Sequence, residues 1–413
     1  MVLLAPTGRA ATVLKSKTGL EARTIHGEIY SFKDIEGEAS ESEAEPVAED
    51  FGQMRLLFDI RQPDSDDSRV YIVDEASMVS DLPGDPTSYA HFGSGNLLGD
   101  FMKIAGANKI IFSGDPSQLP PVGCNDSPAL TEAWFRKKGF PVSGFELSEI
   151  MRHKRDSGIL TLATRVRKLT TDSNLPQWVK LPARGTPQVS LHAFDELKEE
   201  FVKSVLGKEK GNSIAICHSN QNCLDINKKL RQELYGNPLA PLHPGDQLIV
   251  TQNNHLVPFA NGDFGEIIER GQELAYLRIR FVPVTVRSQL TGEDHETLLC
   301  VEPLYNGKAN LHPEQQRQLM IDFSCRMRKK RIKPKSETYH MALQKDPYLN
   351  SLRANFGHAI TCQKSQGGEW NDVFLFLQRG MYVFGAEQLT RWWYTGITRA
   401  KEKLCIADDW WIS

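Results

Sequence analysis

Short apolar runs that alternate with helical stretches constrain the fold of this chain more than any other feature. The runs are Val2–Ala5, Val70–Val73, Lys109–Ser113, Ser213–Cys217, Val373–Leu377 and Leu404–Ala407. Helical patterns lie between them, for example at Arg9–Lys17, Asp195–Leu206, Asn220–Leu234 and Ala386–Trp393. Buried strands separated by helices are typical of parallel sheets that helices cover on both faces. We therefore expect an α/β protein.

Composition narrows the class of protein further. The 413 residues can form two or three domains, and 40% apolar with 24% charged residues is ordinary for a globular chain. Because the net charge is −3, any contact with nucleic acid must come from a local groove. The seven cysteines form no C-x-x-C pair, which favours reduced thiols in the cytoplasm over a zinc site. No apolar run is long enough to cross a membrane, so we expect no membrane partner.

Two segments interrupt the alternation of strands and helices. Residues 33–67 hold eight acidic residues between Asp34 and Asp50, which predicts an acidic loop followed by a small hairpin near Met54–Ile60. Residues 243–352 contain short strand patterns joined by Asn-Gly, Arg-Gly and Thr-Gly turns, which predicts a β-rich insertion. This insertion ends in the run 326–335, in which seven of ten residues are basic. The basic run is a DNA contact, a solvated helix face or a flexible loop.

The strand pattern Val70–Val73 ends in two carboxylates, Asp74 and Glu75. Open parallel sheets bind ligands at the carboxyl ends of their strands. In a nucleotide motor, an Asp at this place holds Mg²⁺ and a Glu polarises the attacking water. The alternative is an ordinary strand that ends in acidic residues.

The strand pattern Lys109–Ser113 runs into a Gly-Asp-Pro turn that presents Gln118. A neutral amide can hydrogen-bond both a γ-phosphate oxygen and a water molecule without adding charge. The alternative is an ordinary proline-rich turn, but the whole string from Ser113 to Gly123 is specific and favours a nucleotide site.

The glycine-rich phosphate loop that usually completes such a site does not occur in these residues. No G-x-x-x-x-G-K-[ST] string is present, and the pairs Gly207-Lys208 and Gly307-Lys308 are followed by Glu209 and Ala309. That loop supplies backbone N–H groups, a cation and a hydroxyl that binds Mg²⁺. We therefore expect these residues alone to be nearly inert as an ATPase.

The order of the motifs resembles the superfamily 1 DNA helicases of the RecD and phage Dda type. Besides the two strand ends, the matching segments are Leu4–Ala11, Thr24–His26, Glu146–Arg152, Thr361–Gly367 and Tyr394–Ala400, which together run along nearly the whole chain. The resemblance implies two RecA-like, P-loop NTPase-type domains with parallel sheets. The first would span 1–150, with the hairpin insertion 33–67 and without its first strand and phosphate loop. The second would span 151–413, with the small barrel-like β-rich insertion 243–352.

The same resemblance implies an activity and its partners. The protein would be an ATP-dependent helicase or translocase that uses ATP and Mg²⁺ and moves 5′→3′ on single-stranded DNA. It would act as a monomer at junctions between single-stranded and duplex DNA. Two rival hypotheses are a non-catalytic remnant or scaffold that binds single-stranded DNA, and an RNA-directed motor of the same superfamily. The hypothesis that we place first is that these residues are an N-terminally truncated part of an active helicase, which would explain the absence of the phosphate loop.

The resemblance also assigns roles to individual residues. The catalytic residues would be Asp74, which holds Mg²⁺, with Glu75, Gln118, Arg152 and Arg399. The nucleotide would be bound by Gly114, Asp115, Gln118, Gly367, Glu369 and Arg399. DNA would be contacted by Pro6, Thr7, Arg9, Thr24, His26, Thr361, Lys364 and Ser365.

Several of these residues have a plain structural alternative. Thr7 and Thr24 could cap helices, and His26 could pack in a core. The two arginines could be surface ion-pair partners. Phe58, near the hairpin, is either a strand-separating wedge or a core side chain. The family has His where this chain has Gln363, whose amide hydrogen-bonds but cannot carry charge.

Overall fold

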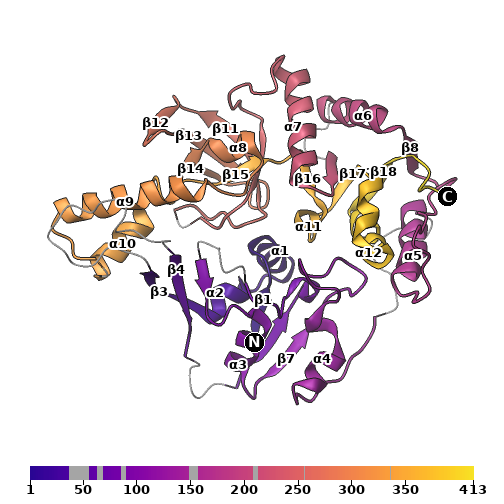
Figure 1. Cartoon of the computed structure of the whole chain (residues 1–413), viewed down its shortest axis with the longest axis horizontal. Helices are drawn as coiled ribbons and strands as arrows, with labels where there is room; N and C mark the ends of the chain where they lie inside the picture. Colours follow the sequence, from indigo (N-terminus) through magenta and orange to yellow (C-terminus); the bar gives the residue numbers. More distant parts are fainter. Residues whose placement is uncertain are drawn as a thin grey trace. The chain divides into compact units, whose positions relative to one another are not determined.

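The computed structural model describes residues 1–36, 55–62, 68–84, 90–147, 157–207, 213–254, 256–334 and 336–413 (Figure 1). The chain forms two compact units. The first unit combines Met1–Ser113 with Leu242–Asn355, and the second combines Gly114–Pro241 with Phe356–Ser413. The predicted boundary between residues 150 and 151 and the predicted acidic loop lie outside the described residues, so both stay predictions.

The first unit contains a four-stranded parallel sheet in the order β2-β1-β5-β7. Its strands are β1 (Val2–Ala5), β2 (Ala22–Thr24), β5 (Val70–Val73) and β7 (Lys109–Phe112). The helices of this part are α1 (Gly8–Thr18), α2 (Ile25–Ile29) and α3 (Leu97–Ala105). Strand β7 is an edge strand among the described residues, and Ile111 on it is 53% exposed.

A small hairpin follows β2 and α2 in the sequence. Strands β3 (Tyr30–Glu36) and β4 (Arg55–Ile60) pair antiparallel, and β6 (Ala90–Phe92) pairs parallel with β4. The sequence predicted a hairpin at this position, and Phe32 lies opposite Phe58 in its register.

The β-rich segment belongs to the first unit, although it interrupts the sequence of the second. Its strands are β10 (Gln247–Val250), β11 (Phe264–Arg270), β12 (Leu274–Tyr276), β13 (Ile279–Ser288), β14 (Asp294–Cys300) and β15 (Ala354–Phe356). Three helices accompany them: α8 (Glu302–Asn306), α9 (Pro313–Lys329) and α10 (Glu337–Lys345). Helices α9 and α10 lie side by side (Figure 1) and share a core built from Met320, Phe323, Met327 and Tyr339.

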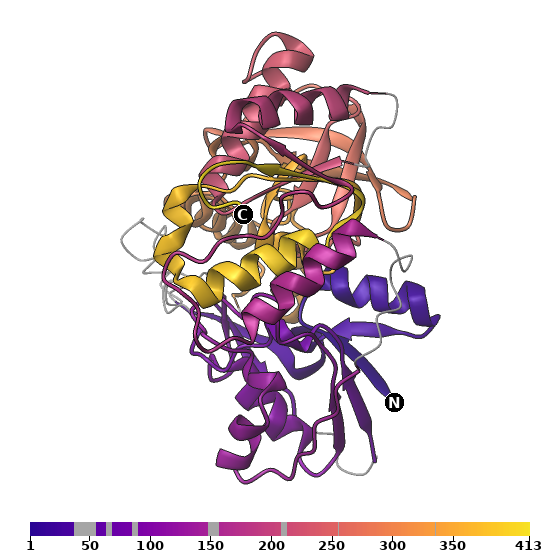
Figure 2. The same cartoon turned by 90° about the vertical axis from the view of Figure 1, so that its right-hand side faces the viewer.

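The second unit contains a five-stranded parallel sheet in the order β16-β9-β17-β18-β8. The strands are β8 (Val189–His192), β9 (Ser213–Cys217), β16 (Ala359–Thr361), β17 (Trp370–Leu375) and β18 (Ala400–Ala407). The helices are α4 (Glu132–Lys137), α5 (Gly158–Thr170), α6 (Phe194–Leu206), α7 (Asn220–Tyr235), α11 (Cys362–Ser365) and α12 (Ala386–Ile397). Helices α5 and α12 lie side by side (Figure 2).

Two parallel sheets with their helices confirm the predicted α/β class. The side chains of Trp392 and Trp393 are both buried on α12. None of the helices in the described part of the chain is both long and apolar enough to cross a membrane.

Candidate functional site

Asp74 and Glu75 lie in a tight turn at the carboxyl end of β5. The Asp74 N–H donates to the Leu4 carbonyl of β1 at 2.9 Å, and the Ala76 N–H donates to the Ser113 carbonyl after β7 at 2.8 Å. The turn is therefore tied to the strands on both sides of β5. Glu75 has a φ of 51°, in the left-handed region that a non-glycine residue rarely adopts. Such strain is concentrated at functional sites, so this turn is a good candidate for one.

The residues of this turn fit a magnesium ion. Mg²⁺ prefers oxygen ligands and is usually bound through one or two carboxylates together with water and substrate phosphates. No cluster of three or more His, Cys, Asp or Glu side chains occurs in the described ranges, so any cation here needs ligands besides the carboxylates. The Ser77 hydroxyl is buried and makes no hydrogen bond to any described residue, which leaves one more oxygen near Asp74 in the sequence.

The segment Asp115–Leu119, which we call the glutamine segment, lies in the second unit and is held in place by α12. The Ser117 N–H donates to the Asp115 carboxylate at 3.0 Å, which closes a local turn. The Tyr394 hydroxyl donates to the same carboxylate at 2.7 Å. The Leu119 N–H donates to the Thr395 hydroxyl at 2.9 Å. These bonds fix the segment against the final motif.

Gln118 is the residue of this segment whose environment most suggests a ligand. Its side chain is only 7% exposed. Its Oε1 atom is buried and, among the described residues, has no hydrogen-bond partner. An unpaired buried acceptor is costly, because the group loses its bonds to water without replacement. A ligand or a bound water would satisfy it.

Arg399 is 1% exposed, at the junction between α12 and β18. All three of its guanidinium nitrogens donate within its own unit. Nε donates to the Thr395 carbonyl at 3.0 Å, Nη1 to the Gly368 carbonyl at 3.2 Å and Nη2 to the Thr398 hydroxyl at 2.9 Å. The side chain is thus a buried, oriented cation and not the surface ion-pair partner of the alternative interpretation. Arg152 lies outside the described residues.

The other residues predicted to bind the nucleotide are more exposed. Gly114 is exposed, while Gly367 has a φ of 75° that favours glycine. Glu369 is exposed, and its carboxylate lies 3.3 Å from the Lys401 ammonium. Their predicted contacts with a nucleotide stay predictions.

Two predicted DNA-contact residues of the first unit cap helices. The Thr7 hydroxyl accepts from the Ala10 N–H at 3.2 Å at the start of α1. The Thr24 hydroxyl accepts from the Gly27 N–H at 3.0 Å at the start of α2. These bonds show that both threonines cap helices, as the structural alternative for them predicted. A cap does not prevent a hydroxyl from also contacting DNA, so the DNA contacts stay predictions, as does that of the half-buried Pro6.

Arg9 and His26 are packed against aromatic rings. The Arg9 guanidinium lies over the Phe264 ring of β11, 4.6 Å from its centre. The His26 ring contacts Tyr30 at 5.6 Å and Phe92 at 5.1 Å between ring centres. Burial lowers the pKa of His26, which favours a neutral ring. A neutral, packed imidazole is a poor phosphate contact.

The predicted DNA-contact residues of the second unit cluster at the short helix α11. Ser365 is buried and its hydroxyl donates to the Cys362 carbonyl at 2.7 Å. Burial lowers the pKa of Lys364, because a charged ammonium is less well solvated there. Thr361 precedes the helix without a side-chain cap. Sequence reasoning missed Gln366, whose Nε2 donates to the Leu119 carbonyl at 3.1 Å and joins this motif to the glutamine segment.

Fold and site together define an α/β protein with two parallel sheets and polar residues at strand ends. Residues 1–179 match the AAA domain family, and residues 356–407 match the UvrD-like helicase C-terminal domain family. The two matches support a superfamily 1 helicase.

One curated relative and several solved structures are similar to this chain. The relative is uncharacterized protein MJ1519 of Methanocaldococcus jannaschii, 24% identical over 445 residues, which covers 98% of this chain and 33% of that protein. This chain thus spans about a third of the length of that relative. A Pif1 helicase from Bacteroides in complex with ADP-AlF3 and ssDNA is 14% identical with a TM-score of 0.47, over 98% of this chain and 82% of that one. Pif1 from Candida albicans is 16% identical with a TM-score of 0.36, over 83% and 73% of the two chains. Because both TM-scores are below 0.5, the family assignment rests on the sequence matches.

Proposed function

We propose that this chain is the motor part of an ATP-dependent DNA helicase or translocase that moves on single-stranded DNA. The observation that carries the proposal is the buried Oε1 atom of Gln118, which has no hydrogen-bond partner among the described residues and lies in a segment fixed by the final helicase motif. A motor must report the state of a phosphate group to the element that moves, and such a glutamine is suited to do so.

The proposed roles follow from the chemistry of each side chain. Asp74 would hold Mg²⁺, which supplies charge neutralisation at the phosphates when bound. Glu75 would accept a proton from the attacking water and orient it. Gln118 would hydrogen-bond that water or a phosphate oxygen. Arg399 would stabilise the charge that develops on the phosphate, after exchanging some of its present hydrogen bonds.

The phosphate loop is the part of the machinery that these 413 residues do not contain in sequence. Phosphoryl transfer depends mainly on positioning and charge stabilisation, which that loop provides. We therefore propose that this chain alone turns over ATP very slowly. Travel from 5′ to 3′, a monomeric state and junction DNA as substrate are part of the same proposal, and their support is the resemblance to the family.

The test is ATP hydrolysis, with and without single-stranded DNA, by a version of the protein extended upstream to include any in-frame G-x-x-x-x-G-K-[ST] segment. We expect stimulation by DNA and loss of activity in Glu75→Gln and Gln118→Ala, roughly a hundredfold or more as for other transition-state groups. Extended versions of the protein that bind DNA but do not hydrolyse ATP would favour the scaffold hypothesis. Equal or stronger stimulation by RNA would favour the RNA-directed motor.

A further inference from the structure

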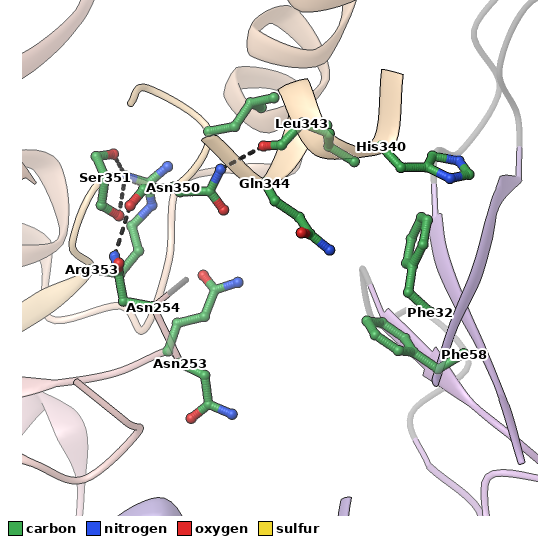
Figure 3. A pocket seen from close by; sticks show the side chains of 12 residues that line it. Phe32, Phe58, Asn253, Asn254, His340, Leu343, Gln344, Asn350, Ser351 and Arg353 are labelled. Carbon is green, nitrogen blue, oxygen red and sulfur yellow. Dashed lines mark hydrogen bonds between the residues drawn. The ribbon is translucent and has the colours of Figure 1, made fainter. Parts of the chain in front are cut away.

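A cavity of about 120 Å³ lies within the first unit, away from the strand-end carboxylates. The β3–β4 hairpin, helix α10 and the segment 252–254 enclose it (Figure 3). Phe32, Phe58 and His340 line one side, and amide side chains, Asn253 and Asn254 among them, line the other. Gln344 of α10 points into the space between the two sides (Figure 3). We call this space the aromatic–amide cavity.

The aromatic side is held in place by neighbouring rings. Phe58 stacks on Phe92, with ring centres 4.5 Å apart and planes at 20°. Phe32 meets Phe58 edge to face at 5.6 Å and His340 edge to face at 5.1 Å. Phe32 also packs against the buried core of α9 and α10. Because these contacts fix the rings, they present a rigid apolar surface to the cavity, as a stacking platform requires.

The amide side offers unused hydrogen-bonding groups. The Gln344 side chain makes no hydrogen bond to any described residue. The Asn253 Oδ1 accepts from the Asn261 N–H at 2.8 Å, and the Gln252 Oε1 accepts from the Asn310 Nδ2 at 2.9 Å. The amide nitrogens of Asn253 and Gln252 remain without a partner within the described ranges. Gln344 therefore supplies donors and an acceptor, and its two neighbours supply donors.

The lining selects an uncharged planar ring. None of the described residues that line the cavity is Lys, Asp or Glu. The arginine among them, Arg353, donates from Nε to Asn310 at 3.2 Å and from Nη2 to the Tyr348 carbonyl at 3.4 Å. A phosphate or a carboxylate would thus find no unpaired cation in the described lining. A cavity of about 150 Å³ in another protein binds one benzene, so this smaller space of about 120 Å³ is limited to one ring of pyrimidine size.

We propose that the aromatic–amide cavity takes one nucleobase of single-stranded DNA, stacked on the Phe32 and Phe58 side and hydrogen-bonded by Gln344. The inference rests on the proposed function, because it assumes that DNA is the partner. A base that belongs to a bound strand is favoured over a free nucleotide for two reasons. The described lining offers no unpaired cation for a phosphate, and a tethered base arrives at a high effective concentration. Aromatic stacking with amide hydrogen bonds is a common means of recognising an unpaired base.

The test is a scan with abasic sites. A duplex with a single-stranded tail fixes the register, and each tail position in turn lacks its base. Binding of the 413-residue chain is measured by fluorescence anisotropy. We expect one position at which loss of the base weakens binding at least about fivefold, the lower end of what base stacking contributes. Gln344→Ala and Phe58→Leu should weaken binding to intact DNA and remove the sensitivity at that position alone.

Gln318→Ala is the matched control, because Gln318 is an exposed glutamine on α9 that does not line the cavity. Gln344 is exposed, so Gln344→Ala should leave thermal unfolding unchanged. If Phe58→Leu is destabilised, the result of Gln344→Ala alone tests the proposal. Binding without a sensitive position, or a sensitivity that persists in Gln344→Ala, would overturn the cavity proposal and leave DNA binding intact. No binding to any DNA would overturn both proposals.

Discussion

Asp263 is a buried carboxyl group whose titration should be visible in the stability of the protein. Burial raises its pKa from 3.8 to about 6, although a hydrogen bond from the Ala260 N–H and the nearby Arg9 act in the opposite direction. Its Oδ1 atom makes no hydrogen bond to any described residue. The folded state therefore binds a proton that the unfolded state has already released between those two pH values.

The sign of the pH effect follows from this difference in proton binding. Because the folded state holds the extra proton, the contribution of Asp263 to the free energy of unfolding should fall as pH rises from about 4 to about 6 and then stay constant. The change should be about 1–3 kcal/mol, at 1.36 kcal/mol for each pKa unit. Urea unfolding of the natural protein and of Asp263→Asn, compared at each pH, isolates this group. A difference that does not vary with pH would show that Asp263 titrates normally.

Thr24 offers a way to separate a helix cap from a DNA contact. Its hydroxyl caps α2 through the Gly27 N–H. Thr24→Ala should cost about 1 kcal/mol of stability, whereas Thr24→Asn should retain it, because Asn is an equally good cap. If the hydroxyl also contacts DNA, both variants should bind single-stranded DNA about two- to tenfold more weakly, as expected for one lost hydrogen bond. Normal DNA affinity in Thr24→Asn would reduce Thr24 to a cap.

The start of helix α1 lies close against the β-rich segment at Ala260. A Cβ atom on Gly8 would lie 1.9 Å from the Ala260 Cβ and 3.3 Å from the Ala260 Cα. Gly8→Ala should therefore force the helix and this loop apart and cost about 1–3 kcal/mol, as overpacking does. Chemical denaturation measures the loss. Ser16→Ala, at an exposed position of the same helix, is the control and should be neutral or slightly stabilising. An unchanged Gly8→Ala variant would mean that the two elements do not pack.

The sequence predicted the central strands well and the short outer ones poorly. Strands β5 (Val-Tyr-Ile-Val) and β9 (Ser-Ile-Ala-Ile-Cys) are short, mostly apolar runs, so their composition reveals them. Strand β2 has the sequence Ala-Arg-Thr, and nothing local distinguishes it from a loop. It is a strand because β1 offers it a parallel partner. Tertiary pairing of this kind overrides local preference.

The candidate site, like the fold, could be predicted from the sequence only in part. Asp74 and Glu75 were predictable because a buried strand delivers them to a sheet edge. The bond between Tyr394 and Asp115 was not, because it joins residues 279 positions apart. The local sequence around either residue does not predict this contact. Thr7 and His26 matched family motifs, but only the structure shows that one caps a helix and the other packs between rings.

Position in the sequence does not determine where the β-rich segment packs. It lies between β9 and β16 of the second sheet, yet its residues belong to the first compact unit. The contacts are specific: Arg9 lies over Phe264, and Phe32 meets His340. The first unit therefore contains a complete aromatic–amide cavity that neither sequence segment could form alone.

DNA binding and ATP hydrolysis should be separable in this protein. The predicted DNA contacts lie within the 413 residues, whereas the phosphate loop does not. We expect the chain to bind single-stranded DNA in an anisotropy assay, more weakly as salt is raised, because phosphate contacts release counterions. Its ATP turnover should lie at least about a hundredfold below that of a version extended to include the loop, since losing even one stabilising donor costs that much. Glu75→Gln in the extended version gives the background rate. Rapid hydrolysis by the 413 residues, abolished by Glu75→Gln, would show instead that they contain a complete nucleotide site of a different design.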